Sequence, residues 1–350
     1  MRITTILIST ALLANASHAH HGARNQFDMS RSIEVEGVIT KVRFVNPHSY
    51  VYFDVSKEGG TVENWRCEMR AAMVLKRSGW TKDMFAPGTH IRIEGRPAHL
   101  EPHTCFVNRL QLGDSELFGR YEQLEGAEAE VAVARRPAML ANGQPNISGD
   151  WAAPQRLLTG GEVQRRAAGG FRGFDYAQSA AGKAAAVDFE ANRDNPRYHC
   201  QPVNIIGDWI FDQNVNRIAQ DDDVITLTYG FMDIVRTIHL DMDGHPGDLV
   251  PSRAGHSIGH WDGDTLVVDT VGLAPGYLDG QFGIMHSDQL HLVERFAFDA
   301  GNGVITRDYV GEDPLYLAES FGDRDNVFLS ATPFEPYNCD DLTTEIVEGD

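Results

Sequence analysis

The feature that most constrains the fold is a series of short segments in the second half of the chain, in which apolar and polar residues largely alternate. These segments cover residues 224–229, 234–240, 265–271, 289–296 and 304–309. Alternation at every second residue is the pattern of a strand with one buried face. Met242-Asp243-Gly244 and Asp262-Gly263-Asp264 lie between such segments, where strands must reverse. This half of the chain therefore predicts a large antiparallel β-barrel or sandwich.

A Gly-x-Trp sequence, Gly149 to Trp151, opens this region. It resembles the first strand of lipocalin barrels, where the Trp closes the bottom of the barrel. The stretch over residues 177–191 has an irregular, partly helical pattern. We therefore expect residues 146–350 to form a lipocalin-like β-barrel domain with a few short helices.

The first half predicts a second, smaller β domain. Residues 33–42, 50–55 and 89–95 alternate in the same way, and only residues 71–77 have a helical pattern. Several short strands and one small helix in fewer than roughly 100 residues are typical of an OB-type barrel. The expected fold class is thus all-β, with an OB-like domain over residues 20–117, a linker over 118–145 and the larger barrel behind it.

The first 19 residues have the pattern of a secretory signal peptide. Arg2 precedes a short apolar stretch over residues 6–13, and small residues stand at Ser17 and Ala19. The alternative is a buried N-terminal helix. Cleavage after Ala19 would give a periplasmic or secreted protein, and the stretch is too short for a retained membrane span.

Composition and cysteine count exclude several classes of protein. Hydrophobic residues make up 42% of the chain, which excludes disorder, and the net charge of −20 argues against nucleic acid as a partner. An exported chain with four cysteines can form disulfides, and pairing within each half (Cys67 with Cys105, Cys200 with Cys339) is the simplest of three connectivities. No C-x-x-C is present, which excludes c-type haem attachment.

A first candidate site lies at the N-terminus of the mature chain. Cleavage after Ala19 leaves His20 and His21 as the first two residues, and His48 stands at a turn that enters a strand. An N-terminal amine and imidazoles suit the tetragonal geometry of Cu(II). We therefore predict copper at His20, His21 and His48; the alternative is an unstructured terminus beside a structural turn residue.

A second candidate site lies in the larger barrel, where histidines, carboxylates and one arginine gather on predicted strands and in the stretches beside them. Its members are Arg236, His256, Asp269, His286, His291 and Glu294. Converging inside an otherwise apolar barrel, they would form a ligand or catalytic site, with His as base or metal ligand, the carboxylate as orienting group and Arg as anion clamp. Alternation places Asp269 on the face of Thr265 and Val267 and separates Glu294 from His291. The alternative is a polar network that fixes strand register.

A nucleophile signature is weaker. Residues 255–259 read GHSIG and match the G-x-S-x-G string around Ser257. A nucleophile elbow needs a strand before it and a helix after it, and here a strand follows. Ser257 is thus a minor candidate for hydrolase chemistry.

The N-terminal part resembles a widespread bacterial family of exported domains of unknown function. Residues 20–28 read HHGARNQFD, 35–39 read VEGVI and 46–49 read NPHS, and Arg77, Gly79 and Trp80 match an R-x-G-W segment of that family. The resemblance covers about residues 18–112. Gly22-Ala23 stands where the family usually has Ser-Phe.

The C-terminal part resembles another exported group of unknown activity, over roughly residues 146–340. The shared elements are the DNPRYHC of residues 194–200, GHS of 255–257, Trp261, GDTLVVDTVG of 263–272, His286-Ser287, His291 and ERF of 294–296. A looser association, without a motif that can be placed, is with single-component oxygenases of the trans-anethole oxygenase type. None of these resemblances implies a particular reaction.

From these residues we predict an exported oxidoreductase of the metal- or haem-dependent oxygenase type. It would act on a small hydrophobic, aromatic molecule in the larger barrel, with haem or iron at His256 and His286. One alternative is a periplasmic protein that carries a small molecule or copper without turnover. Another is a metal-free hydrolase or isomerase that uses Ser257 or a His–carboxylate pair.

Overall fold

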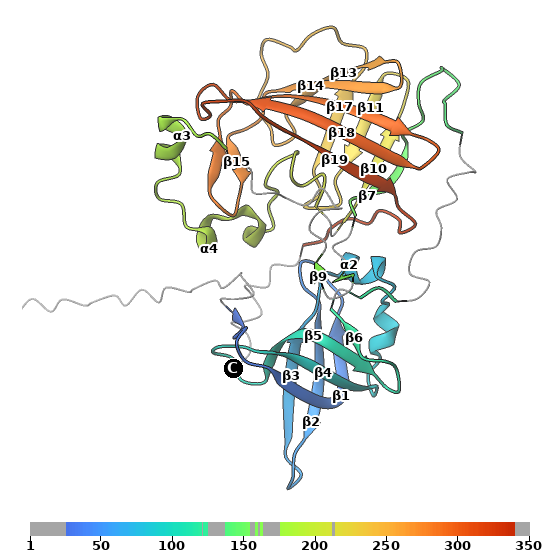
Figure 1. The fold of residues 1–350 in the computed structure, drawn as a ribbon, viewed down its shortest axis with the longest axis vertical. Helices are drawn as coiled ribbons and strands as arrows, with labels where there is room; N and C mark the ends of the chain where they lie inside the picture. The colour runs from blue at the N-terminus through green and yellow to red at the C-terminus, as the bar shows by residue number, and fades with distance from the viewer. Residues whose placement is uncertain are drawn as a thin grey trace, which may run out of the picture.

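A computed structural model describes residues 26–120, 122–124, 137–154, 158–159, 162–163, 176–211 and 214–339. The chain forms two β-barrels, which Figure 1 shows as a blue-green barrel below and a larger yellow-to-red barrel above. The predicted signal peptide and His20 and His21 lie outside the described residues. In the described parts of the chain, no helix has the length and apolar character that crossing a membrane requires.

The smaller barrel has the OB-type arrangement that the sequence predicts. Its sheet runs β3-β2-β1-β4-β5-β6, and a parallel pairing of β3 with β5 closes it. A short helix, α2, connects β3 to β4. The elements are β1 Ile33–Arg43, β2 Tyr50–Ser56, β3 Val62–Glu68, α2 Ala72–Arg77, the 3₁₀ turn η1 Lys82–Phe85, β4 His90–Pro97, β5 Thr104–Leu112 and β6 Phe118–Gly119.

Alternation along these strands separates core from surface. In β1, Val35 and Ile39 are buried whereas Glu34 and Glu36 are exposed. Cys67 on β3 lies directly opposite Cys105 on β5, and the two form a disulfide in the core of the barrel. The next residue on β3, Glu68, therefore points away from that core.

The larger barrel is closed by nine strands in the order β10-β11-β12-β13-β14-β17-β18-β19-β7. Two small hairpins and short helices lie outside the barrel wall (Figure 1). The barrel strands are β7 Gly149–Ala152, β10 Val215–Gln220, β11 Val224–Thr228, β12 Val235–His239, β13 His256–Asp262, β14 Thr265–Val271, β17 His291–Asp299, β18 Val304–Glu312 and β19 Phe321–Leu329. The other elements are β8 Leu158–Thr159, β9 Glu162–Val163, α3 Ala180–Ala185, α4 Ala191–Asp194, η3 Pro196–His199, β15 Gly276–Asp279 and β16 Ile284–His286.

The all-β fold class is confirmed, with one departure from a purely antiparallel barrel. Strands β12 and β13 pair in parallel, through Ile238 with Ser257 and His239 with Ile258. A parallel pair needs a long crossover instead of a tight hairpin, and residues 240–255 supply it. This crossover brings a loop residue, His245, to the wall formed by β13 and β14.

Large aromatic side chains of the larger barrel are buried in its core. Trp151, Trp209 and Tyr229 are each at most 1% exposed, and Trp209 packs edge-on against Tyr229 and Phe296. The Nε1 atom of Trp151 donates to the carbonyl oxygen of Ile147, 2.9 Å away. Trp151 thus has the buried position at the start of the barrel that the Gly-x-Trp resemblance implies.

The two barrels contact each other through the loop before β2 and helix α2. The Nδ2 atom of Asn46 donates to the carbonyl oxygen of Tyr337 at 2.7 Å, and Nη2 of Arg77 donates to that of Ala153 at 2.8 Å. Asn46 also forms a bridge with Cys339, which is disulfide-bonded to Cys200. The NPH motif of the sequence therefore joins the smaller barrel to the C-terminal segment.

Candidate functional site

The predicted site residues do not converge inside the barrel; the structure divides them into three places. Arg236 and Glu294 point inward, because they alternate with outward-facing neighbours on β12 and β17. His256, Asp269 and His291 point outward from β13, β14 and β17. His286 lies apart, on β16. The period of two explains the division, since residues of opposite parity on one strand face opposite sides of the wall.

The inward group is a network of paired charges. Both oxygens of the Glu294 carboxylate are engaged, one by Nη2 of Arg236 in a short contact and the other by Nη1 of Arg307 at 3.1 Å. Arg307 also pairs with Asp325, through Nη2 and Oδ2 at 2.5 Å. These four side chains are at most 3% exposed. Two cations and two anions balance each other in the core, which is how buried charges are tolerated.

Ser257 belongs to this interior network. Its Oγ accepts a hydrogen bond from Nε of Arg236 at 3.0 Å and lies 2.9 Å from Oγ1 of Thr270. The residue is 0% exposed. Ser257 is therefore buried in the barrel, and its hydroxyl is hydrogen-bonded within the network. A substrate at the surface cannot reach it.

The outward group forms a continuous hydrogen-bonded series across the wall. Nδ1 of His256 lies 2.8 Å from Nδ1 of His245, and Nε2 of His245 lies 2.9 Å from Oδ1 of Asp269. The other oxygen of Asp269, Oδ2, lies 2.9 Å from Nε2 of His291. Nδ1 of His291 faces Oε1 of Glu312 at 3.4 Å. We call His256, His245, Asp269, His291 and Glu312 the wall series.

The hydrogen bonds assign the tautomers of the wall series. A carboxylate only accepts, so Nε2 of His245 carries the proton that bonds to Asp269. In the neutral form of His245 that is its only proton, and its Nδ1 must accept from Nδ1 of His256. Neutral His256 then has no proton on Nε2. This nitrogen has no hydrogen-bond partner among the described residues and is available as a base.

The surroundings separate the pKa values of the two outer histidines. Burial, followed by the neighbouring His245 and His239, lowers the pKa of His256. The ring of His239 stacks on that of His256, with centroids 5.2 Å apart. For His291, burial opposes the charged form, but the hydrogen bond and charge of Asp269 outweigh it and raise the pKa. The Asp269 carboxylate thus lies between two different imidazoles of the series. His291, whose pKa is raised, contacts Asp269 directly, and His256, whose pKa is lowered, is connected to it through His245.

Asp269 is expected to control the protonation of His291. Burial raises the pKa of the Asp269 carboxyl, but hydrogen bonds from His291 and His245 outweigh it and lower the pKa. In a pH titration followed by long-range ¹H–¹⁵N NMR, the pKa of His256 should lie below the ordinary value of about 6.5 and that of His291 above it. Asp269→Asn removes the negative charge and should lower the pKa of His291.

The matched control for that titration is Asp262→Asn, which removes an exposed carboxylate of the same wall that pairs with Arg295. It should leave the pKa of His291 unchanged. An unchanged His291 in Asp269→Asn would contradict the assignment. The raised pKa of His291 also has a consequence for stability. Below the pKa that His291 has in the unfolded chain, its contact with Asp269 stabilises the folded state fully. This stabilisation is lost as pH rises through the pKa of His291 in the folded state.

The structure places the predicted cofactor pair, His256 and His286, on different elements, β13 and β16. His286 is 3% exposed, and its Nδ1 lies 2.9 Å from the carbonyl oxygen of Ser287. His256 instead belongs to the outer wall and bonds to His245. Across the described ranges, no three His, Cys, Asp or Glu side chains are arranged to hold a metal ion.

Sequence reasoning missed four members of these two groups. His245 and Glu312 complete the wall series, and Arg307 and Asp325 complete the interior network. Arg307 carried a usable signal, since it is a charged residue at an inward position of the predicted strand over residues 304–309. His245 carried none, because it lies in an irregular crossover.

Comparison with known proteins bears on the smaller barrel alone. Residues 7–104 match the model of a family of unknown function, DUF6152. This agrees with the resemblance of the N-terminal part to exported domains of unknown function. No curated protein and no solved structure matches the chain.

Proposed function

We propose that the protein is an enzyme of proton-transfer chemistry, a hydrolase or isomerase, with His256 on the outer wall of the larger barrel as its general base. One observation carries this proposal. The His256–His245–Asp269 hydrogen bonds orient a neutral imidazole and leave its Nε2 without a partner among the described residues. A base held by a second group, which is itself held by a carboxylate, is the arrangement of activated catalytic centres.

The roles of the other residues follow from their positions. His245 holds the ring of His256 in one tautomer, and Asp269 holds His245. His291 binds the second oxygen of Asp269 and, with its raised pKa, is the group suited to donate a proton. Titratable groups whose surroundings move their pKa values apart are the usual acid and base of one site.

The surroundings of the wall series favour a substrate with an apolar portion. Asp269 is flanked in register by Ile258 on β13 and Val293 on β17. Val293 pairs in turn with Val310, which is 56% exposed. Apolar side chains beside polar groups of defined orientation are the composition of small-molecule sites. A small hydrophobic molecule, as the sequence predicts, suits this surface better than a multiply charged one.

The oxidoreductase function that the sequence predicts stays a prediction. Its predicted haem or iron ligands, His256 and His286, lie on different elements, β13 and β16, and no step is derived through such a group. An absorption spectrum and elemental analysis for Fe, Cu and Zn on the untagged exported protein test it directly. If the same preparation turns over a substrate, the protein is an enzyme of one of these two kinds. A protein that only carries a ligand would bind it without turnover.

Removal of the base should abolish most of the activity. A panel of esters and carbon acids incubated with the protein in D₂O, followed by NMR, detects both hydrolysis and proton abstraction. For an accepted substrate, His256→Ala should reduce the rate by roughly 100-fold to 10,000-fold, the usual contribution of general base catalysis. The rate of the intact enzyme should rise with pH through the lowered pKa of His256, because the base must be neutral.

His260→Ala is the matched control. His260 lies on the same strand, faces the same side and is exposed. Its replacement should change the rate less than twofold. Equal rates for His256→Ala and the intact protein would reject His256 as the base, and loss of activity on chelation would favour the metal-dependent reading.

A further inference from the structure

We propose that the Cys200–Cys339 disulfide is a redox switch. A dithiol reductant opens it, which releases the C-terminal segment and loosens the contact between the two barrels. The C-terminal segment is residues 330–339, which follow β19. The switch is independent of the acid–base site, because it concerns how the barrels are held together, and either proposal can fail without the other.

The two disulfides differ in how accessible their cysteines are. Cys67 and Cys105 are 0% exposed and face each other on paired strands in the core of the smaller barrel. Cys200 ends the 3₁₀ turn η3, Cys339 lies in the C-terminal segment, and both are partly exposed. A thiolate must reach a sulfur atom for exchange to occur. A reductant should therefore open the Cys200–Cys339 disulfide first.

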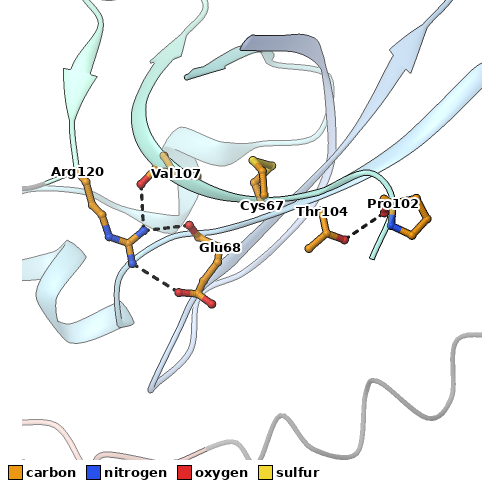
Figure 2. Close-up of a disulfide and its surroundings, with 7 residues drawn as sticks. Cys67, Glu68, Pro102, Thr104, Val107 and Arg120 are labelled. Atoms are coloured by element: carbon orange, nitrogen blue, oxygen red, sulfur yellow. Dashed lines mark hydrogen bonds and ion pairs between the residues drawn. A yellow bond between two sulfur atoms is a disulfide. The ribbon is translucent and has the colours of Figure 1, made fainter. Parts of the chain in front are cut away.

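Hydrogen bonds also hold the surroundings of the buried disulfide in place. Nη1 of Arg120 donates to the carbonyl oxygens of Glu68 on β3 at 3.0 Å and of Val107 on β5 at 3.1 Å, beside Cys67 (Figure 2). Nδ1 of His48, the third predicted copper ligand, lies 3.3 Å from Oε1 of Glu68. The strands that carry the buried disulfide are thus joined by side chains as well as by the backbone, and its reduction should leave them in place.

The C-terminal segment is attached to the larger barrel by backbone hydrogen bonds to two aspartates. The N–H groups of Ser330 and Phe334 donate to the carbonyl oxygen and to Oδ2 of Asp150, at 2.9 and 3.0 Å. The N–H group of Tyr337 donates to Oδ1 of Asp233 at 2.8 Å. Two residues further on, the disulfide adds a covalent link to the same barrel.

The same segment contacts the smaller barrel. Nδ2 of Asn46 donates to the carbonyl oxygen of Tyr337 at 2.7 Å, and Asn46 forms a parallel bridge with Cys339. Nζ of Lys76 on α2 pairs with the carboxylate of Glu335 in a short contact. Both barrels therefore hold the segment, and the disulfide fixes its end at the point where they meet.

Tyr337, which anchors the segment, has a buried polar group without a partner. Its ring packs against that of Phe231 with centroids 5.0 Å apart, and the residue is 1% exposed. Its hydroxyl is buried and has no hydrogen-bond partner among the described residues. Such burial is unfavourable. Release of the segment lets this hydroxyl reach water, which favours opening once the disulfide no longer prevents it.

Backbone conformations at this contact also favour release. Five non-glycine residues in the described ranges have a positive φ, and four of them lie here. Cys200 (φ 52°) belongs to the disulfide, Asn338 (φ 46°) adjoins it, and Met232 (φ 58°) and Asp233 (φ 54°) form the turn against which Tyr337 packs. Such conformations persist only where surrounding contacts impose them, and Asn and Asp tolerate them better than Cys and Met. Opening the disulfide lets Cys200 and Asn338 relax.

The opening step is a thiol–disulfide exchange. One thiolate of the dithiol attacks a sulfur atom of the disulfide and forms a mixed disulfide, while the other cysteine leaves as a thiolate. The second thiolate of the reductant then displaces the remaining cysteine. The protein gains two electrons and two protons as its disulfide becomes two thiols, and the dithiol is oxidised to a disulfide. An oxidised dithiol reverses the step and closes the switch.

The experiment uses the full folded chain, purified without a tag under oxidising conditions and equilibrated with mixtures of reduced and oxidised dithiothreitol. Free thiols are alkylated with N-ethylmaleimide, and mass spectrometry identifies the labelled cysteines. We expect labelling of Cys200 and Cys339 at ratios of reduced to oxidised dithiothreitol that leave Cys67 and Cys105 unlabelled. Equal labelling of all four cysteines would overturn the proposal.

The same samples test what the opened disulfide releases. Hydrogen exchange should increase over residues 330–339 and at Asn46, and small-angle X-ray scattering should show a larger radius of gyration. If the Cys200–Cys339 disulfide opens while exchange and scattering stay unchanged, the disulfide is accessible but holds nothing, and the proposal is wrong.

Tyr337→Phe tests the release of the segment separately. It keeps the ring and removes the buried hydroxyl, so it stabilises the closed state relative to the open one. The ratio of reduced to oxidised dithiothreitol at which half of the Cys200–Cys339 disulfide is open should rise about tenfold. Tyr52→Phe, a matched change on β2 of the smaller barrel, should leave this ratio unchanged. An unchanged ratio in Tyr337→Phe would contradict release of the segment.

Discussion

Replacing Glu294 with Gln is expected to lower the free energy of unfolding of the larger barrel by about 3–5 kcal/mol. The carboxylate lies between two buried guanidinium groups, those of Arg236 and Arg307, and is 0% exposed. An amide presents an NH₂ group to one of them and leaves a positive charge without compensation. Because the site is enclosed, solvent cannot replace the missing charge.

The neighbouring residue provides the control for this variant. Arg295 follows Glu294 on β17 but points outward, where it pairs with Asp262 at 3.0 Å, and both partners are about half exposed or more. Exposed ion pairs of this kind contribute at most about 1 kcal/mol. Arg295→Gln should therefore have a small effect. Urea unfolding of both variants, followed by fluorescence of the barrel tryptophans, measures the difference; equal losses would contradict a structural role for the interior network.

The carboxylate of Glu294 should also make the stability of the larger barrel depend on pH. Burial raises the pKa of Glu294, but Arg236 and Arg307 outweigh it, so the folded-state pKa is lowered. The stabilisation it provides is fully present above the unfolded value of about 4.3 and is lost as pH falls through the folded value. The network therefore stabilises the barrel throughout the neutral range.

The strand pattern of the sequence predicts which residues share a face, but not always which face is inside. On β14 the run Leu266-Val267-Val268 is apolar on both faces, so alternation alone does not orient it. The structure buries Leu266 and Val268 and leaves Asp269 on the outer wall. On β17 a carboxylate, Glu294, takes an inward position. This is possible because two buried arginines pair with it, Arg236 on β12 and Arg307 on the neighbouring strand β18.

The wall series shows a different limit of sequence reasoning. Asp269 and His291 were identifiable because they lie on predicted strands, and His256 because it stands in the histidine-containing stretch that precedes one of them. His245 connects them, yet its position depends on the crossover between β12 and β13 and on their parallel pairing. Strand periodicity carries no information about where a long connection lies. The residue that orients the proposed base was therefore beyond prediction.

Replacing Cys200 and Cys339 with Ser should cost the larger barrel about 5 kcal/mol of unfolding free energy. The disulfide closes a loop with a sequence separation of 139 residues. In the chain-entropy account, constraint of the unfolded state grows with the logarithm of loop length, which gives about 5 kcal/mol here. For the pair Cys67 and Cys105, with a separation of 38 residues, the same relation gives about 4 kcal/mol.

The two disulfides should differ more clearly in what they hold together. Cys339 forms a bridge with Asn46, whose side chain binds the carbonyl oxygen of nearby Tyr337. Loss of the Cys200–Cys339 link frees this segment, so hydrogen exchange should increase both there and at Asn46 in the other barrel. Loss of the Cys67–Cys105 link leaves that contact in place. If both double variants changed exchange at Asn46 equally, the C-terminal segment would not be what couples the two barrels.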